Sequence, residues 1–113
     1  MHELSIALGI VKIAEAETRK AGAARVDVIE LEIGRLAGIE LDSLEFVWPL
    51  AVENTLLQDA RRKIHLIDGQ ALCMDCDRQF PIEHIYDCCP VCGSSVKTVT
   101  KGKELRVMAL EVA

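Results

Sequence analysis

Residues 73–92 read CMDCDRQFPIEHIYDCCPVC and contain two C-x-x-C pairs, Cys73/Cys76 and Cys89/Cys92, with twelve residues between the pairs. A C-x-x-C pair can form a tight knuckle whose backbone amides point at the thiolates. Two facing knuckles give four sulfur atoms in a tetrahedron, which suits zinc with Zn–S distances near ~2.3 Å. Four protein ligands leave zinc no open position, so the spacing predicts a structural zinc rather than a hydrolytic one.

Other uses of these cysteines stay open at this point. Disulfides would require an oxidising compartment, and iron accepts the same four thiolates. The segment Cys-Pro-Val-Cys-Gly at residues 89–93 would also suit the knuckle of a rubredoxin-like iron electron carrier. Zinc is the interpretation that the spacing of the two pairs favours most.

Two further residues of this segment carry chemistry. Choosing Cys88 in place of Cys89 would break the C-x-x-C spacing, so we expect Cys88 to remain a free thiol. His84 lies in the loop between the two pairs, where most surface histidines have no special role. The alternative for His84 is a place near another metal site.

The sequence on the N-terminal side of the cysteines predicts two helices. Apolar residues recur at i, i+3, i+4 and i+7 in Leu4, Ala7, Leu8 and Val11. This pattern indicates an amphipathic helix from Leu4 to about Lys20. A second helix follows residues 42–45, Asp-Ser-Leu-Glu, which resemble a capping box. Pro49 within that stretch predicts a helix that kinks or restarts there.

Alternating or β-branched stretches predict three strands, at Val26–Ile33, Lys63–Ile67 and Leu105–Val112. Between the last two, cysteine, proline and turn residues gather and helical periodicity disappears. We therefore expect an α+β fold in which two helices pack on a small three-stranded sheet, with an inserted zinc-ribbon-like module. The first domain would comprise residues 1–68 and 103–113, and the zinc-binding module residues 69–102.

Composition excludes several classes of function. The chain has 113 residues and a formal net charge of −5, and 4% of its residues are aromatic. Few aromatics and scattered basic residues make it a poor candidate for binding nucleic acid. No apolar run approaches the ~18 residues that a membrane helix needs, and no basic segment precedes the first apolar stretch, as a secretory signal would require. We therefore expect a cytoplasmic protein with no membrane insertion, whose cysteines stay reduced.

The first three residues, Met1-His2-Glu3, offer a second metal chemistry. The terminal amine of Met1, the amide nitrogen of His2 and an imidazole nitrogen of His2 can close two adjacent small chelate rings on one metal. The amide nitrogen of Glu3 lies close by. Nitrogen donors held nearly coplanar suit Ni(II) or Cu(II), for which square-planar geometry is diagnostic. Taken alone this pattern is weak, because any chain that begins Met-His carries the same atoms.

The whole chain resembles the HypA/HybF family of accessory proteins, which deliver nickel during maturation of [NiFe]-hydrogenase. The resemblance rests on residues 1–5 (Met-His-Glu-Leu-Ser), residues 31–34 (Leu-Glu-Ile-Gly), the two C-x-x-C pairs and the closing strand-like segment 104–112. These features occur in the same order and with similar spacing along essentially the entire sequence. The resemblance implies a nickel metallochaperone that is not an enzyme.

The resemblance also implies the metal ligands and the partners. It implies a nickel site at Met1, His2 and Glu3, and zinc ligands at Cys73, Cys76, Cys89 and Cys92. An acidic residue after the first strand is linked to nickel in some family members, and the nearest match here is Glu40. A HypB-type GTPase and the [NiFe]-hydrogenase large-subunit precursor are the implied partners. In some organisms, urease maturation proteins also draw on the family.

A function of another class stays open from the residues alone. The paired knuckles also permit a zinc-ribbon module that binds nucleic acid or protein and has no nickel function. Neither His65 nor His84 lies in a recognisable nucleophile or metal motif, so an enzyme is the interpretation that the sequence favours least.

Overall fold

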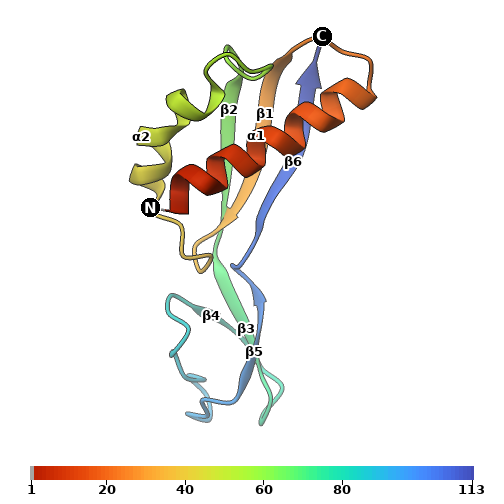
Figure 1. The fold of residues 1–113 in the computed structure, drawn as a ribbon. Helices are drawn as coiled ribbons and strands as arrows, with labels where there is room; N and C mark the ends of the chain where they lie inside the picture. The colour runs from red at the N-terminus through yellow and green to blue at the C-terminus, as the bar shows by residue number, and fades with distance from the viewer. Residues whose placement is uncertain (1) are drawn as a thin grey trace. The chain divides into compact units, whose positions relative to one another are not determined.

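The computed structural model describes residues 2–113 and contains two helices and six strands (Figure 1). In chain order these are α1 (His2–Lys20), β1 (Val26–Gly34), α2 (Leu41–Val52), β2 (Arg61–Ile67), β3 (Gly69–Cys73), β4 (Gln79–Ile82), β5 (Lys97–Lys101) and β6 (Leu105–Val112). The strands form two three-stranded sheets, with strand orders β2-β1-β6 and β4-β3-β5. The predicted α+β class, with two helices on a small sheet, is confirmed. The second sheet was not predicted.

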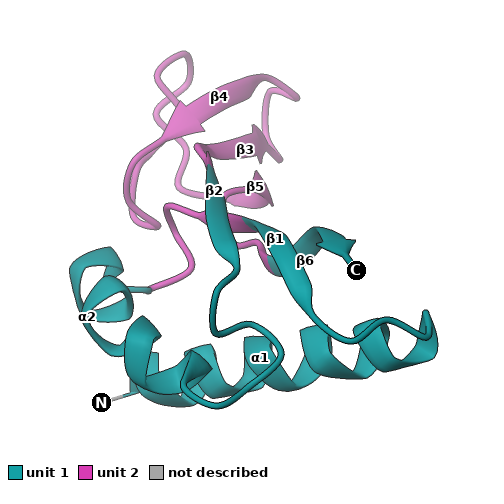
Figure 2. Ribbon diagram, turned by 90° about the horizontal axis from the view of Figure 1, so that it is seen from above, with its two compact units in different colours: residues 1–31, 39–65, 106–113 teal, residues 32–38, 66–105 magenta. Residues whose placement is uncertain are grey.

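The chain divides into two compact units (Figure 2). The first unit comprises residues 1–31, 39–65 and 106–113, and the second comprises residues 32–38 and 66–105. The segment 32–38, which the sequence placed with the first domain, packs with the second unit instead. Its backbone forms hydrogen bonds to residues 67, 102 and 104. These residues are more than thirty positions away in the chain, so a local sequence pattern does not predict the contacts.

In the first unit, both helices lie on one face of the β2-β1-β6 sheet (Figures 1 and 2). Backbone hydrogen bonds join Val26 to Leu56 and Arg35 to Ile67, so β1 and β2 advance in the same direction. A parallel pair needs a crossover connection, and α2 provides it. The Ala113 N–H donates to the Arg25 carbonyl at the start of β1, so β6 returns antiparallel along the other side of β1.

Helix α1 turns a narrow face of small and β-branched residues toward the core. Its fully buried apolar positions are Ala7, Ile10, Val11 and Ala14. Leu8, which the apolar pattern placed in the buried stripe, is about half exposed, and so is Ile13. The two alanines have no exposed surface, which allows close approach of the neighbouring elements. Within residues 2–113, no helix is both long enough and apolar enough to cross a membrane.

Helix α2 differs from its sequence-based prediction at both ends. The N-cap is Glu40 and makes no side-chain capping bond, so the expected capping box that starts at Asp42 is wrong. Instead, the Glu40 N–H donates to the carboxylate of Glu3 on α1, over 3.4 Å. The helix also runs through Pro49 without restarting. Pro49 lies in the final turn, where the missing N–H leaves only the exposed Glu45 carbonyl without its helical donor.

In the second unit, β3 is the central strand and pairs antiparallel with both neighbours. Three glycines come together where this sheet begins. A Cβ atom on Gly34 would lie 1.9 Å from the carbonyl oxygen of Gly102, and a Cβ atom on Gly102 would lie 2.7 Å from the Cα atom of Gly69. Gly102 also has a φ of +112°, which side chains rarely tolerate. The backbones therefore approach more closely here than any other residue type allows.

We predict that Gly34→Ala destabilises the protein, because the new methyl group meets backbone atoms that cannot rotate away. The expected loss is about 1–3 kcal/mol or more in the free energy of unfolding, measured by urea titration of the zinc-replete protein. Gly9→Ala is the matched control. Gly9 lies within α1 with nothing within 4 Å of the added Cβ, so alanine there should stabilise by up to ~1 kcal/mol. Equal stability of the two variants would contradict the close glycine contact.

Candidate metal centre

The two C-x-x-C pairs form knuckles with the same backbone pattern. The Cys73 N–H donates to the Arg78 carbonyl, and the Asp77 N–H donates back to the Cys73 carbonyl. In the second knuckle, Cys89 and Gly93 make the corresponding bonds, with the Cys89 N–H donating to the Ser94 carbonyl. The residue after each second cysteine has a positive φ, of 60° at Asp77 and 74° at Gly93. Glycine takes this conformation freely and aspartate tolerates it, so the local sequence favours both turns.

The knuckles bring four sulfur atoms together, those of Cys73, Cys76, Cys89 and Cys92. All four lie within 4.8 Å of one another. The Sγ atoms are 3.5 Å apart for Cys73 and Cys92, and 3.6 Å apart for Cys76 and Cys89. Tetrahedral zinc with Zn–S bonds of about 2.3 Å would space its sulfurs by roughly 3.8 Å. The spacing therefore fits zinc, and it is far longer than the S–S bond of about 2.05 Å that a disulfide requires.

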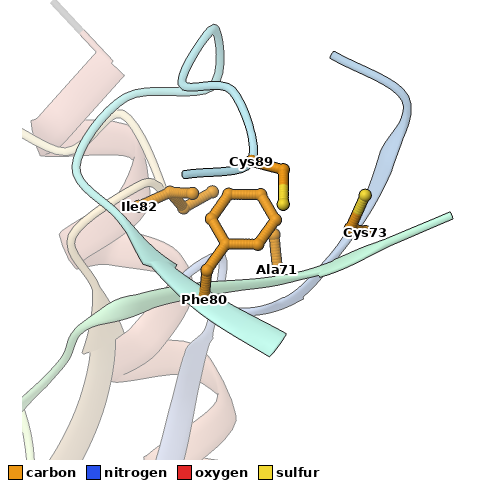
Figure 3. Packing of buried hydrophobic residues seen from close by; sticks show 5 residues of the cluster. All are labelled: Ala71, Cys73, Phe80, Ile82 and Cys89. Atoms are coloured by element: carbon orange, nitrogen blue, oxygen red, sulfur yellow. The ribbon is translucent and has the colours of Figure 1, made fainter. Parts of the chain in front are cut away.

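A small apolar cluster supports the sulfur atoms. Its buried members are Ala71, Cys73, Phe80, Ile82 and Cys89. Figure 3 shows the Phe80 ring lying between Ile82 and Cys89, with Ala71 beside it. Each knuckle thus supplies one buried cysteine to the core of the second unit, whereas Cys92 is exposed.

Polar contacts also tie one knuckle to the other. The Ser94 hydroxyl donates to the Asp75 carboxylate and accepts a hydrogen bond from the Val96 N–H at 3.1 Å. The Met74 N–H in turn donates to the Val96 carbonyl at 3.0 Å. Sequence reasoning missed Asp75 and Ser94, because their hydrogen bond joins residues from two knuckles that lie far apart in the chain. The signal available in the sequence is that each lies two residues after a candidate ligand, Asp75 after Cys73 and Ser94 after Cys92.

The backbone of the knuckles changes the acidity of the thiols. The Cys92 N–H lowers the pKa of Cys89 to about 6 against the opposing effect of desolvation, and the Val91 N–H acts in the same direction. The Arg78 N–H lowers the pKa of Cys76, but desolvation and hydrogen bonds to the other three thiols outweigh it and raise that pKa to about 12. One sulfur is thus an anion near neutral pH while a neighbour holds a proton. A metal that binds all four sulfurs must therefore displace protons.

The remaining residues of the cysteine segment lie outside this cluster. Cys88 is exposed, and its sulfur donates to the Tyr86 carbonyl at 3.8 Å. The ring of His84 stacks on Tyr86 with centroids 4.8 Å apart, and its Nδ1 lies 3.6 Å from the Asp87 carboxylate. Hydrogen bonds from the backbone N–H groups of Glu83 and His84 lower the pKa of Asp87. Within residues 2–113, the four cysteines are the only group of three or more candidate ligands placed to share a metal.

Two of the candidate nickel residues, His2 and Glu3, lie at the start of α1. Met1 is outside the described residues. The His2 side chain is 67% exposed, and its Nε2 lies 3.0 Å from the carboxylate of Glu3, whose own side chain is only 6% exposed. Glu40 meets this group through its backbone N–H rather than its side chain, which is exposed. The structure thus brings His2, Glu3 and the Glu40 backbone together, and His84 belongs to the other unit.

Comparison with known proteins gives consistent results over the whole chain. A family model described as HypA, hydrogenase/urease nickel incorporation metallochaperone, matches residues 1–112. The chain is 43% identical to the hydrogenase maturation factor HypA of Parabacteroides distasonis over 99% of this chain and 97% of the relative. It is 44% identical to the HypA of Azotobacter vinelandii, covering 99% of each. The fold is similar to the solution structure of the Ni metallochaperone HypA from Helicobacter pylori, with a TM-score of 0.72 and 24% sequence identity. The match covers 99% of this chain and 97% of the Helicobacter pylori chain.

Cys89 and Cys88 are adjacent, so they offer a sharp test of the sulfur cluster. If four ligands share the ~10–16 kcal/mol of binding typical of structural zinc, Cys89→Ser should remove on the order of 3 kcal/mol, or about a hundredfold in zinc affinity. Cys88→Ser should keep full zinc content, because its sulfur lies outside the cluster. Zinc content and the visible spectrum of the Co(II)-substituted protein measure both effects. Full zinc affinity in Cys89→Ser would show that the four-sulfur site is wrong.

Proposed function

The chain belongs to the HypA family of hydrogenase and urease nickel-incorporation metallochaperones, and we propose that it binds Ni(II) at its N-terminus and delivers it for maturation of [NiFe]-hydrogenase. The observation that carries this proposal is the position of His2, whose exposed imidazole stands on the first turn of α1 beside the chain terminus. The match to the family over residues 1–112 supports it.

The start of a helix is suited to chelation through backbone nitrogen. The first four N–H groups of an α-helix have no intrahelical partner. The amides of His2 and Glu3 are among them, so a metal that displaces their protons breaks no helical hydrogen bond. Together with the terminal amine of Met1 and the imidazole of His2, they complete a set of four nitrogen donors. Such a set suits a square-planar Ni(II) ion.

We assign a structural zinc to Cys73, Cys76, Cys89 and Cys92. The distances between the sulfur atoms and the two matched knuckles support zinc, and a site filled by four protein ligands has no position left for a substrate. The zinc would fix the loop between the knuckles, which exposes Ile85 and Tyr86. Its role would be to hold this part of the fold, whereas nickel would be cargo.

The proposed cycle takes place in the cytoplasm with a HypB-type GTPase and the [NiFe]-hydrogenase large-subunit precursor as partners, and with urease maturation proteins as further candidates. An exposed terminal site suits transfer, because its ligands can leave one at a time while the acceptor's ligands replace them. Nickel binding should also weaken on acidification, because protons compete with the metal for the same nitrogen atoms.

We predict that His2→Ala and a one-residue extension before Met1 both strongly weaken nickel binding without changing zinc content. The extension is the sharper change, because it keeps every side chain and only moves the amine away from the chelate. Isothermal titration with Ni(II), on protein whose native terminus is verified by mass spectrometry, measures the affinities. Unchanged nickel affinity in both variants, with zinc still bound, would rule out the N-terminal site.

A further inference from the structure

We propose that the carboxylate of Glu3 is a positioning group that orients His2 for nickel and is not itself a nickel ligand. The inference rests on the proposed N-terminal nickel site, and it gives the Glu3 side chain a role other than coordination. It follows from three features: the ring nitrogen that the chelate uses, the place where the carboxylate is held, and the cost of moving it.

The chelate determines which nitrogen of His2 meets the metal. A metal bound to the backbone nitrogen of His2 closes a small ring through Nδ1 of the same residue, whereas Nε2 lies on the far side of the imidazole. Nε2 therefore keeps its hydrogen and needs an acceptor. In the structure, Nε2 lies 3.0 Å from Oε2 of Glu3, which leaves Nδ1 free for the metal.

The carboxylate that lies beside Nε2 is fixed from the protein side. Its Oε2 atom accepts the N–H of Glu40, the N-cap of α2, at 3.4 Å. Glu3 itself lies in the first turn of α1. One buried carboxylate thus sits at the N-terminal ends of both helices, where the helix dipoles favour a negative charge.

A fixed acceptor beside a metal-binding histidine has a defined effect. It selects the tautomer that carries its hydrogen on Nε2, holds the ring in one orientation and makes Nδ1 a stronger donor to the metal. Coordination through the Glu3 carboxylate would instead require it to leave the Glu40 N–H and its buried place. That movement would leave a backbone donor without its partner, which is costly in a buried setting.

The test compares Glu3→Ala and Glu3→Gln with the matched control Glu15→Gln in the full-length, zinc-loaded protein. Glu15 is another glutamate on α1 whose carboxylate accepts a backbone N–H, from Leu56 at 3.1 Å, but it lies far along the helix from His2. We expect nickel affinity to fall about 10–100-fold in Glu3→Ala, by less in Glu3→Gln because its amide oxygen still accepts, and not at all in Glu15→Gln.

Two spectroscopic readouts separate positioning from coordination and from a purely structural role. The visible spectrum of bound Ni(II) should be the same in wild type and both Glu3 variants, because the nitrogen ligands are unchanged. In the metal-free protein, the ¹⁵N chemical shifts of the His2 ring should report the Nε2–H tautomer in wild type and a mixture in Glu3→Ala. Circular dichroism and zinc content verify that each variant is folded.

The outcomes are distinct. An altered nickel spectrum in the Glu3 variants would make the carboxylate a ligand and overturn the inference. Unchanged nickel affinity in Glu3→Ala, when His2→Ala has lost binding, would also overturn it while leaving the proposed function intact. If His2→Ala binds nickel as tightly as wild type, the proposed function fails and the inference fails with it.

Discussion

The convergence of four sulfur atoms is the constraint on which the second unit depends. Besides two of those cysteines, the apolar cluster beside the sulfur atoms has three buried members, Ala71, Phe80 and Ile82. Burial of three apolar side chains provides roughly 5–8 kcal/mol at most, which is small beside the conformational entropy of ordering the about 47 residues of this unit. A metal bound to both knuckles would supply what the core lacks, because its binding energy would be available only to the folded chain. The close backbone contacts of Gly34, Gly69 and Gly102 add no apolar core of their own.

The two proposed metal sites differ in the way that a resident metal and a cargo metal should differ. The cysteine site draws on two knuckles far apart in the sequence, two of its ligands are buried, and it leaves the metal no free position. The N-terminal site uses atoms of successive residues at one end of a helix, beside an imidazole that is 67% exposed. Release from the first site would unfold its surroundings. Release from the second disturbs only one helical turn.

The sequence-based predictions were accurate where the interactions join residues close together in the chain, and they failed where the interacting residues are far apart in the chain. The sulfur cluster was predictable because a C-x-x-C knuckle is local, and its backbone bonds join residues at most five apart. Helix α1 was predictable from its periodicity, although Leu8 proved more exposed than the apolar pattern suggested. The cap of α2 was missed because its acceptor, Glu3, lies 37 residues away on another helix. Segment 32–38 was misplaced for the same reason, since its partners lie beyond residue 66.

The charge of the proposed nickel chelate would explain why a helix start can hold a cation at all. The N-terminus of a helix carries a partial positive charge, so a bare divalent cation would be repelled there. A metal that displaces the amide protons of His2 and Glu3 acquires two anionic nitrogen atoms, and the chelate as a whole becomes neutral. The carboxylate of Glu3, buried below it and bonded to the Glu40 N–H, then offsets the positive ends of both helices without neutralising the metal directly. The first backbone N–H groups of a helix have no intrahelical acceptor. In the proposed site, these groups become metal ligands, and the neutral chelate that they form is not repelled by the positive end of the helix.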